Sequence, residues 1–350
     1  MAQLATRFAA DSSSFGQYVF GVIIMVAIAL VAIFLHMTAH EAGHLIFGLL
    51  SGYEFVSFRI GSHTLIKQNG KINYKRFTLP GTGGQCLMSP PPYNDGNYPF
   101  VLYNLGGVIV NLAIALLFLI IMLALRPTSN FAFSFCVLMI AVGLAVAVLN
   151  GIPFNNNLIS NDGYNALSLG KNKAALRGFW LSLEVNKLQS EGQRMRDIDE
   201  SFFDVEDGAD LTTPLSSVPL ISKENRLMDC KDFDGADQII GRLLSDECGV
   251  VGIHENLLRL DRLYIDVFRN GPAADFSILQ NKQMRSFIKA MSSYPAVIRT
   301  LYAVSVAKAD LPEQNKLLAR MNKLSRSYPY AGEIATEMEL MTAIAQRAVE

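Results

Sequence analysis

The sequence lacks a strong charge of either sign, since 30 Lys and Arg residues stand against 31 Asp and Glu residues. No soluble stretch holds a dense basic cluster, so binding to nucleic acid is not expected. Cysteines are also scarce: the four that occur are widely separated and form no CxxC pair. These absences argue against a nucleic-acid-binding protein and against a disulfide framework.

Charged residues are nearly missing from long stretches of the first half, and 51% of the whole chain is hydrophobic. Three runs, at about 17–50, 101–125 and 131–150, approach or exceed the ~20 residues that cross a bilayer as helix. From about residue 171 onward charges recur every few positions. The sequence therefore predicts a membrane half, 1–170, followed by a soluble half, 171–350.

The first apolar run is not expected to be a secretory signal, because it continues to residue 50 without a small-residue cleavage site. Basic residues gather between residues 51 and 100 and again after residue 170. Such segments tend to stay on the cytoplasmic side. We therefore expect an integral protein of the cell membrane, with its N-terminus outside and its C-terminal half in the cytoplasm.

The segment between the first two runs, 53–88, predicts a small β element associated with the membrane. Residues 55–60 and 64–67 alternate as strands do, and Asn69-Gly70 is a strong two-residue hairpin signal. A run rich in helix breakers, 79–85, follows.

The soluble half predicts successive amphipathic helices, with examples at 236–244, 255–268, 282–292 and 314–326. The pattern at 233–240 suggests a tetratricopeptide-like repeat. The acidic stretch 197–210 is interpreted as a solvated linker. The expected fold class is mostly α: a polytopic membrane protein with a three-helix core, a β-hairpin element and a soluble helical domain.

The sharpest motif is His40-Glu41-Ala42-Gly43-His44. On a helix, His40 and His44 share one face and can reach one Zn²⁺ ion, while Glu41 stands beside them to take a proton from water. Ionisable groups beside a membrane-spanning run are costly unless they serve a site. His36 lies on the same face, but it is ~12 Å from His44 along the helix axis, too far for the same ion.

A catalytic zinc needs a third protein ligand, and Asp162 is the candidate we favour. It precedes Gly163 and follows the polar run 155–157, which could not face lipid. Glu54, His63 and Asp95 are the rival ligands, although Asp95 lies in a turn-forming segment.

In the second apolar run, Asn104 and Asn111 are seven residues apart and so lie on one helix face. Polar side chains there either hold helices together or orient a substrate near the metal.

These motifs resemble those of the site-2 protease family of intramembrane zinc metallopeptidases. The likeness rests on residues 40–44, on 104–111 and on Asn150-Gly151-Ile152-Pro153 leading to Asp162-Gly163. The resemblance implies substrate contacts at Asn104, Asn111, Gly83 and Gly84, with the β element holding an unwound substrate as an added strand. One departure is the longer gap before Asp162, with Asn161 in place of the usual Leu.

The expected function is hydrolysis of peptide bonds in membrane-spanning or membrane-associated proteins, with Glu41 as general base. The expected partners are a transmembrane protein substrate, the lipid bilayer, and a cytoplasmic protein or peptide bound by the helical half. Three alternatives remain: a catalytically silent scaffold that binds partners through the helical half, a transporter, and a soluble-type zinc peptidase.

Overall fold

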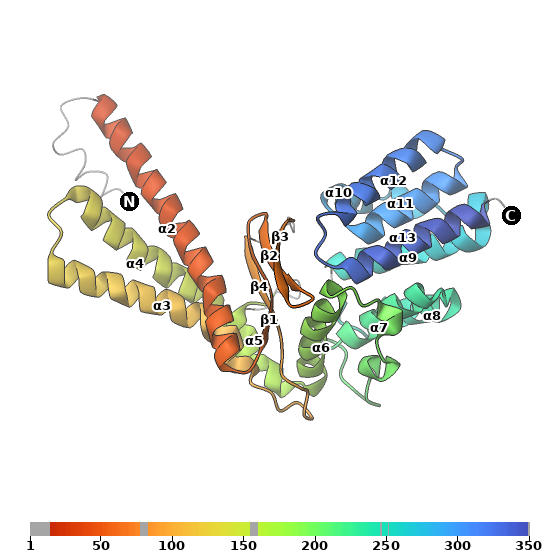
Figure 1. Cartoon of the computed structure of the whole chain (residues 1–350), viewed down its shortest axis with the longest axis horizontal. Helices are drawn as coiled ribbons and strands as arrows, with labels where there is room; N and C mark the ends of the chain where they lie inside the picture. Colours follow the sequence, from red (N-terminus) through yellow and green to blue (C-terminus); the bar gives the residue numbers. More distant parts are fainter. Residues whose placement is uncertain (1–14, 78–82, 155–159, 246, 251, 349–350) are drawn as a thin grey trace. The chain divides into compact units, whose positions relative to one another are not determined.

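The computed structural model describes residues 15–77, 83–154, 160–245, 247–250 and 252–348, which are mostly helical (Figure 1). The chain divides into two compact units. The first comprises Met1–Glu54, Gly83–Cys86 and Pro99–Ser168, and the second comprises Phe55–Thr82, Leu87–Tyr98 and Leu169–Glu350. The polar run 155–157 that the sequence places in a cavity lies outside the described residues.

Three long apolar helices dominate the first unit: α2 (Phe15–Leu50), α3 (Phe100–Leu125) and α4 (Asn130–Gly151). Each is long and apolar enough to cross a membrane, which confirms the three predicted runs. The three helices contact one another pairwise. Between α2 and α4 lies a small apolar core of Met25, Ile28, Ala32, Leu138 and Met139.

The sheet has four strands, in the order β3-β2-β1-β4 (Figure 1). They are β1 (Glu54–Ile60), β2 (His63–Gln68), β3 (Lys71–Arg76) and β4 (Gly84–Ser89). The antiparallel pair β2–β3 turns at Asn69 and Gly70, whose φ angles of 51° and 75° are both positive, as a type I′ hairpin requires.

The hairpin prediction is therefore confirmed. No strand pattern predicted β4, although the predicted β element, 53–88, extends over most of it. This strand begins at Gly84, inside the run rich in helix breakers, 79–85. Residues 78–82 of that run lie outside the described residues.

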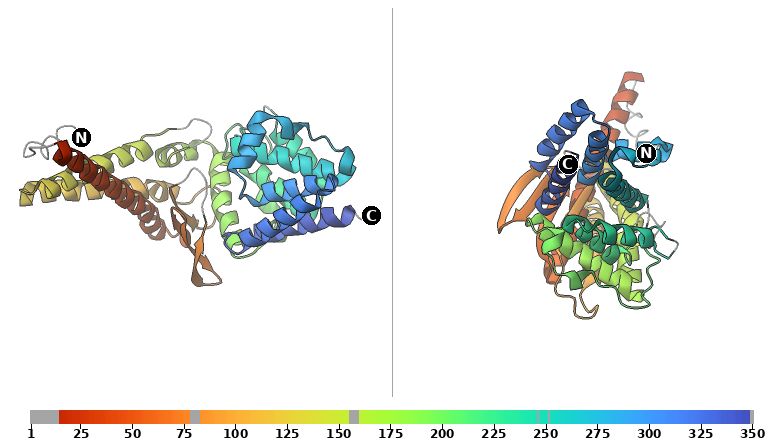
Figure 2. Two further views of the ribbon diagram at one scale, coloured as in Figure 1. Left: turned by 90° about the horizontal axis from the view of Figure 1, so that it is seen from above. Right: turned by 90° about the vertical axis from the view of Figure 1, so that its right-hand side faces the viewer.

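The first unit ends with α5 (Asp162–Ser168), and the helical part of the second unit follows (Figure 2). Its helices are α6 (Lys173–Ser190), α7 (Val218–Cys230), α8 (Phe233–Leu243), α9 (Gly252–Asn270), α10 (Lys282–Ala290), α11 (Pro295–Ala307), α12 (Leu311–Ser325) and α13 (Ala331–Arg347). The predicted helices are all present. The tetratricopeptide-like character stays a prediction.

Within the second unit the β2–β3 hairpin is bonded to the helical part. The Gln68 side chain donates to the carbonyls of Ser190 and Pro329, at 2.8 and 3.3 Å. Lys75 Nζ donates to the Tyr328 carbonyl at 2.9 Å. The hairpin and the helices thus form one folded body.

The acidic stretch 197–210 is not the solvated linker that its composition suggested. It contains a short 3₁₀ helix, Glu200–Phe203, and Phe203 is fully buried against Leu181 and Ile198. The apolar side chains spaced among the acidic ones bind the segment to α6, because burying them outweighs the solvation of their neighbours.

Candidate metal centre

Three side chains from distant parts of the first unit meet at one point. His40 Nε2 lies 2.9 Å from Asp162 Oδ2 and 3.2 Å from His44 Nε2, and His44 Nε2 lies 3.4 Å from the same carboxylate oxygen. Both histidines are 8% exposed. Among the described residues this is the group of side chains whose ligand atoms converge closely enough to hold a metal ion.

The two histidines face inward because α2 and α3 cross at glycines. Gly43 of α2 and Gly106 of α3 lie backbone to backbone, so that a Cβ atom on Gly106 would come within 2.5 Å of the Gly43 carbonyl oxygen. A Cβ atom on Gly107 would overlap the ring of His40. Glycine at these positions therefore makes room for the histidine rings between the helices.

Each histidine uses its other ring nitrogen to contact α3. His44 Nδ1 lies 2.8 Å from the backbone carbonyl of Tyr103, to which it donates. His40 Nδ1 lies 3.0 Å from the side-chain amide of Asn111. Contacts of this kind fix the ring orientation of a metal-binding histidine and leave Nε2 for the ion.

Asp162 is presented by a turn that Asn161 holds together. The Asn161 side chain accepts hydrogen bonds from the backbone N–H groups of Phe154 and Tyr164, both at 3.0 Å. It also donates to the carbonyls of Leu149 and Ile152, at 2.8 and 2.6 Å. The residue that departs from the resembled motif is thus the one that joins the end of α4 to the start of α5.

Glu41 lies beside the two histidines and under the first residues of β4. A Cβ atom on Gly84 would come within 2.9 Å of Glu41 Oε1, and the Glu41 carboxylate accepts a hydrogen bond from the backbone N–H of Cys86. Tyr103 donates its hydroxyl to the Cys86 carbonyl at 3.0 Å. These contacts hold the start of β4 against Glu41, the candidate general base.

The remaining predicted residues fall in different places. Gly83 lies against the side chain of Met37, one residue before β4 begins. Asn104 is 3% exposed and donates to the Phe100 carbonyl of its own helix, whereas Asn111 contacts His36 and His40.

The rival ligands are engaged or exposed. His63 bonds to the Tyr74 hydroxyl within the hairpin, at 2.7 Å. Glu54 and Asp95 are exposed, and Asp95 occupies a turn with φ of 50°. Both nitrogens of His36 have partners, Asn111 and the Met139 carbonyl, so neither is free for an ion.

Sequence reasoning missed two residues that shape this centre. Tyr103 contributes its backbone carbonyl, which no side-chain pattern reveals. Gly143 contributes only the space that it leaves for the ring of His36. Glycine inside an apolar helix was the available signal for such a position. It lowers helix stability, so its presence there indicates a close packing contact.

The donor set fits a catalytic zinc ion. Two imidazole nitrogens and one carboxylate oxygen are a ligand set that zinc peptidases use, and three protein ligands leave a position for water. His40 and His44 would bind through Nε2, because their Nδ1 atoms have other partners. Asp162 would bind through Oδ2.

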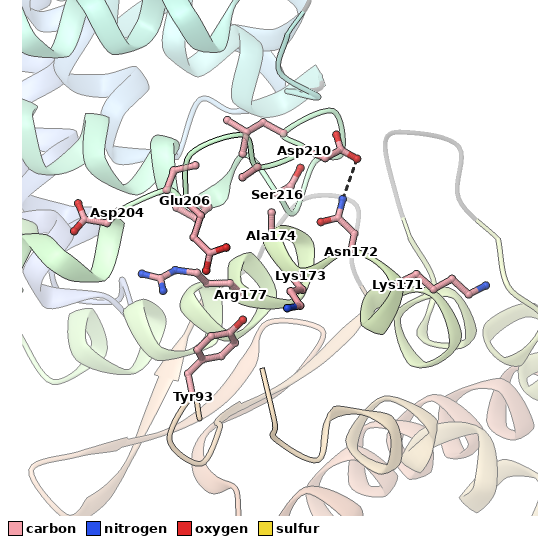
Figure 3. Close-up of a pocket in the computed structure, with 14 residues that line it drawn as sticks. Tyr93, Lys171, Asn172, Lys173, Ala174, Arg177, Asp204, Glu206, Asp210 and Ser216 are labelled. Carbon is pink, nitrogen blue, oxygen red and sulfur yellow. Dashed lines mark hydrogen bonds between the residues drawn. The ribbon is translucent and has the colours of Figure 1, made fainter. Parts of the chain in front are cut away.

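The second unit contains a cavity of about 280 Å³ beside the N-terminal end of α6 (Figure 3). Its lining carries three basic side chains, Lys171, Lys173 and Arg177, and three acidic ones, Asp204, Glu206 and Asp210. Tyr93 closes one side. Its mixed charge suits a polar or zwitterionic group.

Comparison with known proteins agrees with the geometry of the first unit. Residues 28–315 match peptidase family M50, a match that covers most of the chain. The chain belongs to this family, the site-2 protease family of membrane metallopeptidases. No curated protein and no solved structure matches the chain.

Proposed function

We propose that this protein is an intramembrane zinc endopeptidase that hydrolyses peptide bonds of membrane-spanning or membrane-associated proteins. The observation that carries the proposal is the convergence of His40, His44 and Asp162 beside Glu41, at helices long enough to span a membrane. The match to peptidase family M50 supports the reaction type.

A zinc ion held by the three ligands would lower the pKa of water toward neutrality and polarise the scissile carbonyl. Glu41 accepts the proton of the attacking water and delivers it to the leaving amine. The hydrogen bond from the Cys86 N–H holds the carboxylate in place for both steps.

The substrate is proposed to unwind and lie along the open edge of β4. A helical substrate hides its carbonyls in its own hydrogen bonds, so a strand added to an exposed sheet edge exposes them. β4 is an edge strand, and at Gly84 its backbone lies against the Glu41 carboxylate, while Gly83 directly precedes it. Asn104 and Asn111 act within the helix bundle in this proposal, because their amides already have protein partners.

The proposed location is the cell membrane, with the N-terminus outside and the second unit in the cytoplasm. The basic residues between the first two spans and after the third support this orientation. There the helical part would bind a cytoplasmic protein or peptide partner, and the mixed-charge cavity of Figure 3 is a candidate contact.

The first test measures bound zinc in the purified full chain and in two variants. We expect one zinc ion per chain in the native protein and in Glu41→Gln, and a loss of zinc in Asp162→Ala. A metal-replete native chain without zinc would refute the proposal.

A second test separates a peptidase from a silent scaffold. New N-termini of membrane proteins are compared by mass spectrometry in cells that express the native chain or Glu41→Gln. Loss of the general base lowers the rate about 10²–10⁴-fold, so new termini should appear only with the native chain. Identical sets of termini would favour the scaffold.

A further inference from the structure

A continuous row of contacts runs from the candidate metal centre to the backbone of α4. His40 Nδ1 lies 3.0 Å from the Asn111 amide, and the other atom of that amide lies 2.9 Å from His36 Nδ1. His36 Nε2 lies 2.8 Å from the backbone carbonyl of Met139. The row joins all three spans, since the histidines are on α2, Asn111 on α3 and Met139 on α4.

The row is sealed from its surroundings. His36 and Asn111 are both 0% exposed. A Cβ atom on Gly143 of α4 would come within 2.6 Å of the His36 ring, so this glycine makes room for it. Buried polar groups need partners, and here every polar atom in the row meets one.

The Met139 carbonyl can only accept, and this fixes the direction of the row. A neutral His36 must then carry its hydrogen on Nε2 and accept at Nδ1. The Asn111 nitrogen would then have to donate to that Nδ1, and the Asn111 oxygen would face His40. His40 in turn carries its hydrogen on Nδ1 and keeps the lone pair of Nε2 for the ion.

The structure places the Asn111 amide the other way, with its nitrogen toward His40 and its oxygen toward His36. That orientation would leave His40 with a hydrogen on Nε2, the atom that faces Asp162, and His36 would have to donate from both nitrogens and carry a charge between apolar helices. The oxygen and nitrogen of an amide are assigned from their partners. A metal-loaded site therefore requires the amide in the turned orientation.

We infer that Asn111 and His36 are positioning residues, which hold His40 in the tautomer that binds the metal. The inference rests on the proposed zinc site and adds the residues that prepare it. His36 cannot itself bind the metal, because both of its ring nitrogens already have partners, Asn111 and the Met139 carbonyl. The inference gives this buried histidine a role.

The test uses the full chain in detergent and measures zinc affinity by competition with a chelating dye. Asn111→Leu removes the acceptor for His40 and should weaken zinc binding about 10–100-fold, the usual effect of losing such a contact. Asn111→Asp still offers an oxygen to His40, and a charged His36 can donate to its carboxylate. The zinc affinity of this variant should therefore stay within a few-fold of native. If Asn111 had a merely structural role, Asn111→Asp would bury a carboxylate and lower zinc affinity at least as much as Asn111→Leu does.

Ser134→Ala is the matched control, because Ser134 is also buried among the three spans, at 2% exposed on α4, and lies outside the row. Its zinc affinity should be native. If native protein binds zinc and Asn111→Leu binds it equally well, the positioning role is wrong while the proposed function stands. If native protein binds no zinc, the proposed function itself fails.

A second measurement needs no variant. The chain has five histidines, so ¹⁵N labelling of histidine in the zinc-loaded protein gives few signals. His40 should be bound to the ion through Nε2 with hydrogen on Nδ1, and His36 should be neutral with hydrogen on Nε2. A charged His36, or one with hydrogen on Nδ1, would overturn the inference.

Discussion

Gly163 lies directly against the backbone carbonyl of Gly151, so close that a Cβ atom on Gly163 would overlap the carbonyl oxygen. The two residues belong to the start of α5 and the end of α4. Their contact determines where the neighbouring Asp162 carboxylate points.

Gly163→Ala should therefore weaken the candidate metal centre. Overpacking a tight contact costs about 1–3 kcal/mol, and here the strain is relieved by moving Asp162 away from His40 and His44. We expect zinc affinity to fall about tenfold or more, since 1.4 kcal/mol corresponds to a factor of ten.

The control for this change is Gly241→Ala. A Cβ atom on Gly241 would meet only the flexible end of Arg262, at 3.3 Å. Its zinc affinity should be native. Native zinc affinity in Gly163→Ala would show that the turn can relax without moving Asp162.

Asn161→Leu tests the residue that departs from the resembled motif. The substitution removes four hydrogen bonds to backbone groups of the turn before Asp162. Unpaired backbone groups cost about 1–3 kcal/mol when they are buried, and these are partly exposed, so we expect the lower end of that range. Zinc content and thermal unfolding of the purified chain should both decrease.

Asn165→Leu is a neighbouring comparison, since the Asn165 Oδ1 atom has no hydrogen-bond partner among the residues that the structure describes. It should lose less zinc than Asn161→Leu. Equal losses would mean that the turn is held by its apolar contacts instead of by Asn161.

The sequence predicted the parts of the centre that have a periodic or chemical signature. His40 and His44 are four residues apart within a long apolar run, and such spacing places both on one helix face. The Asn69-Gly70 hairpin was equally visible, because its positive φ angles demand those residue types. The partners of the histidines were not visible, since a backbone carbonyl such as that of Tyr103 leaves no mark in the sequence.

The missed strand and the misjudged linker share one cause. β4 begins at a glycine, which disfavours strands locally, and it forms because it pairs within the sheet. Phe203 lies among acidic residues whose charge dominates the composition, yet the second unit buries it. In both cases distant contacts decide the local structure.

Arg299 should be essential for the stability of the second unit. It is 2% exposed and pairs with Asp261 and with Glu337, the latter at 2.8 Å. Removing one partner of a buried pair leaves uncompensated charge and costs about 3–5 kcal/mol. We expect Arg299→Met to shift urea unfolding strongly to lower concentration, monitored by the fluorescence of Trp180, the single tryptophan of the chain.

The matched control is Arg259→Met. Arg259 pairs with Glu255 one turn away on the surface of α9, where both side chains are more than 40% exposed. Pairs of this kind contribute about 0.3–0.5 kcal/mol. Similar losses in the two variants would show that the buried pairs contribute no more than a surface pair.

The second unit should lose stability as the pH rises from about 4.5 to about 8. Burial, together with the nearby Glu337, raises the pKa of Glu333 to about 8, although the hydrogen bond from Tyr328 acts in the opposite direction. The folded state therefore keeps a proton that the unfolded state releases above pH 4.5. Because the unfolded state binds fewer protons over this range, the free energy of unfolding falls as the pH increases.

The measurement is the urea midpoint of Trp180 fluorescence at pH 5 and pH 8. The native chain should be less stable at pH 8, and Glu333→Gln, which cannot ionise, should show a smaller difference. Burial also raises the pKa of Glu337 and Glu224, so part of the slope will remain. Glu313→Gln, at a side chain 39% exposed on α12, should keep the native slope. An unchanged slope in Glu333→Gln would show that Glu333 is ionised in the folded protein at pH 7.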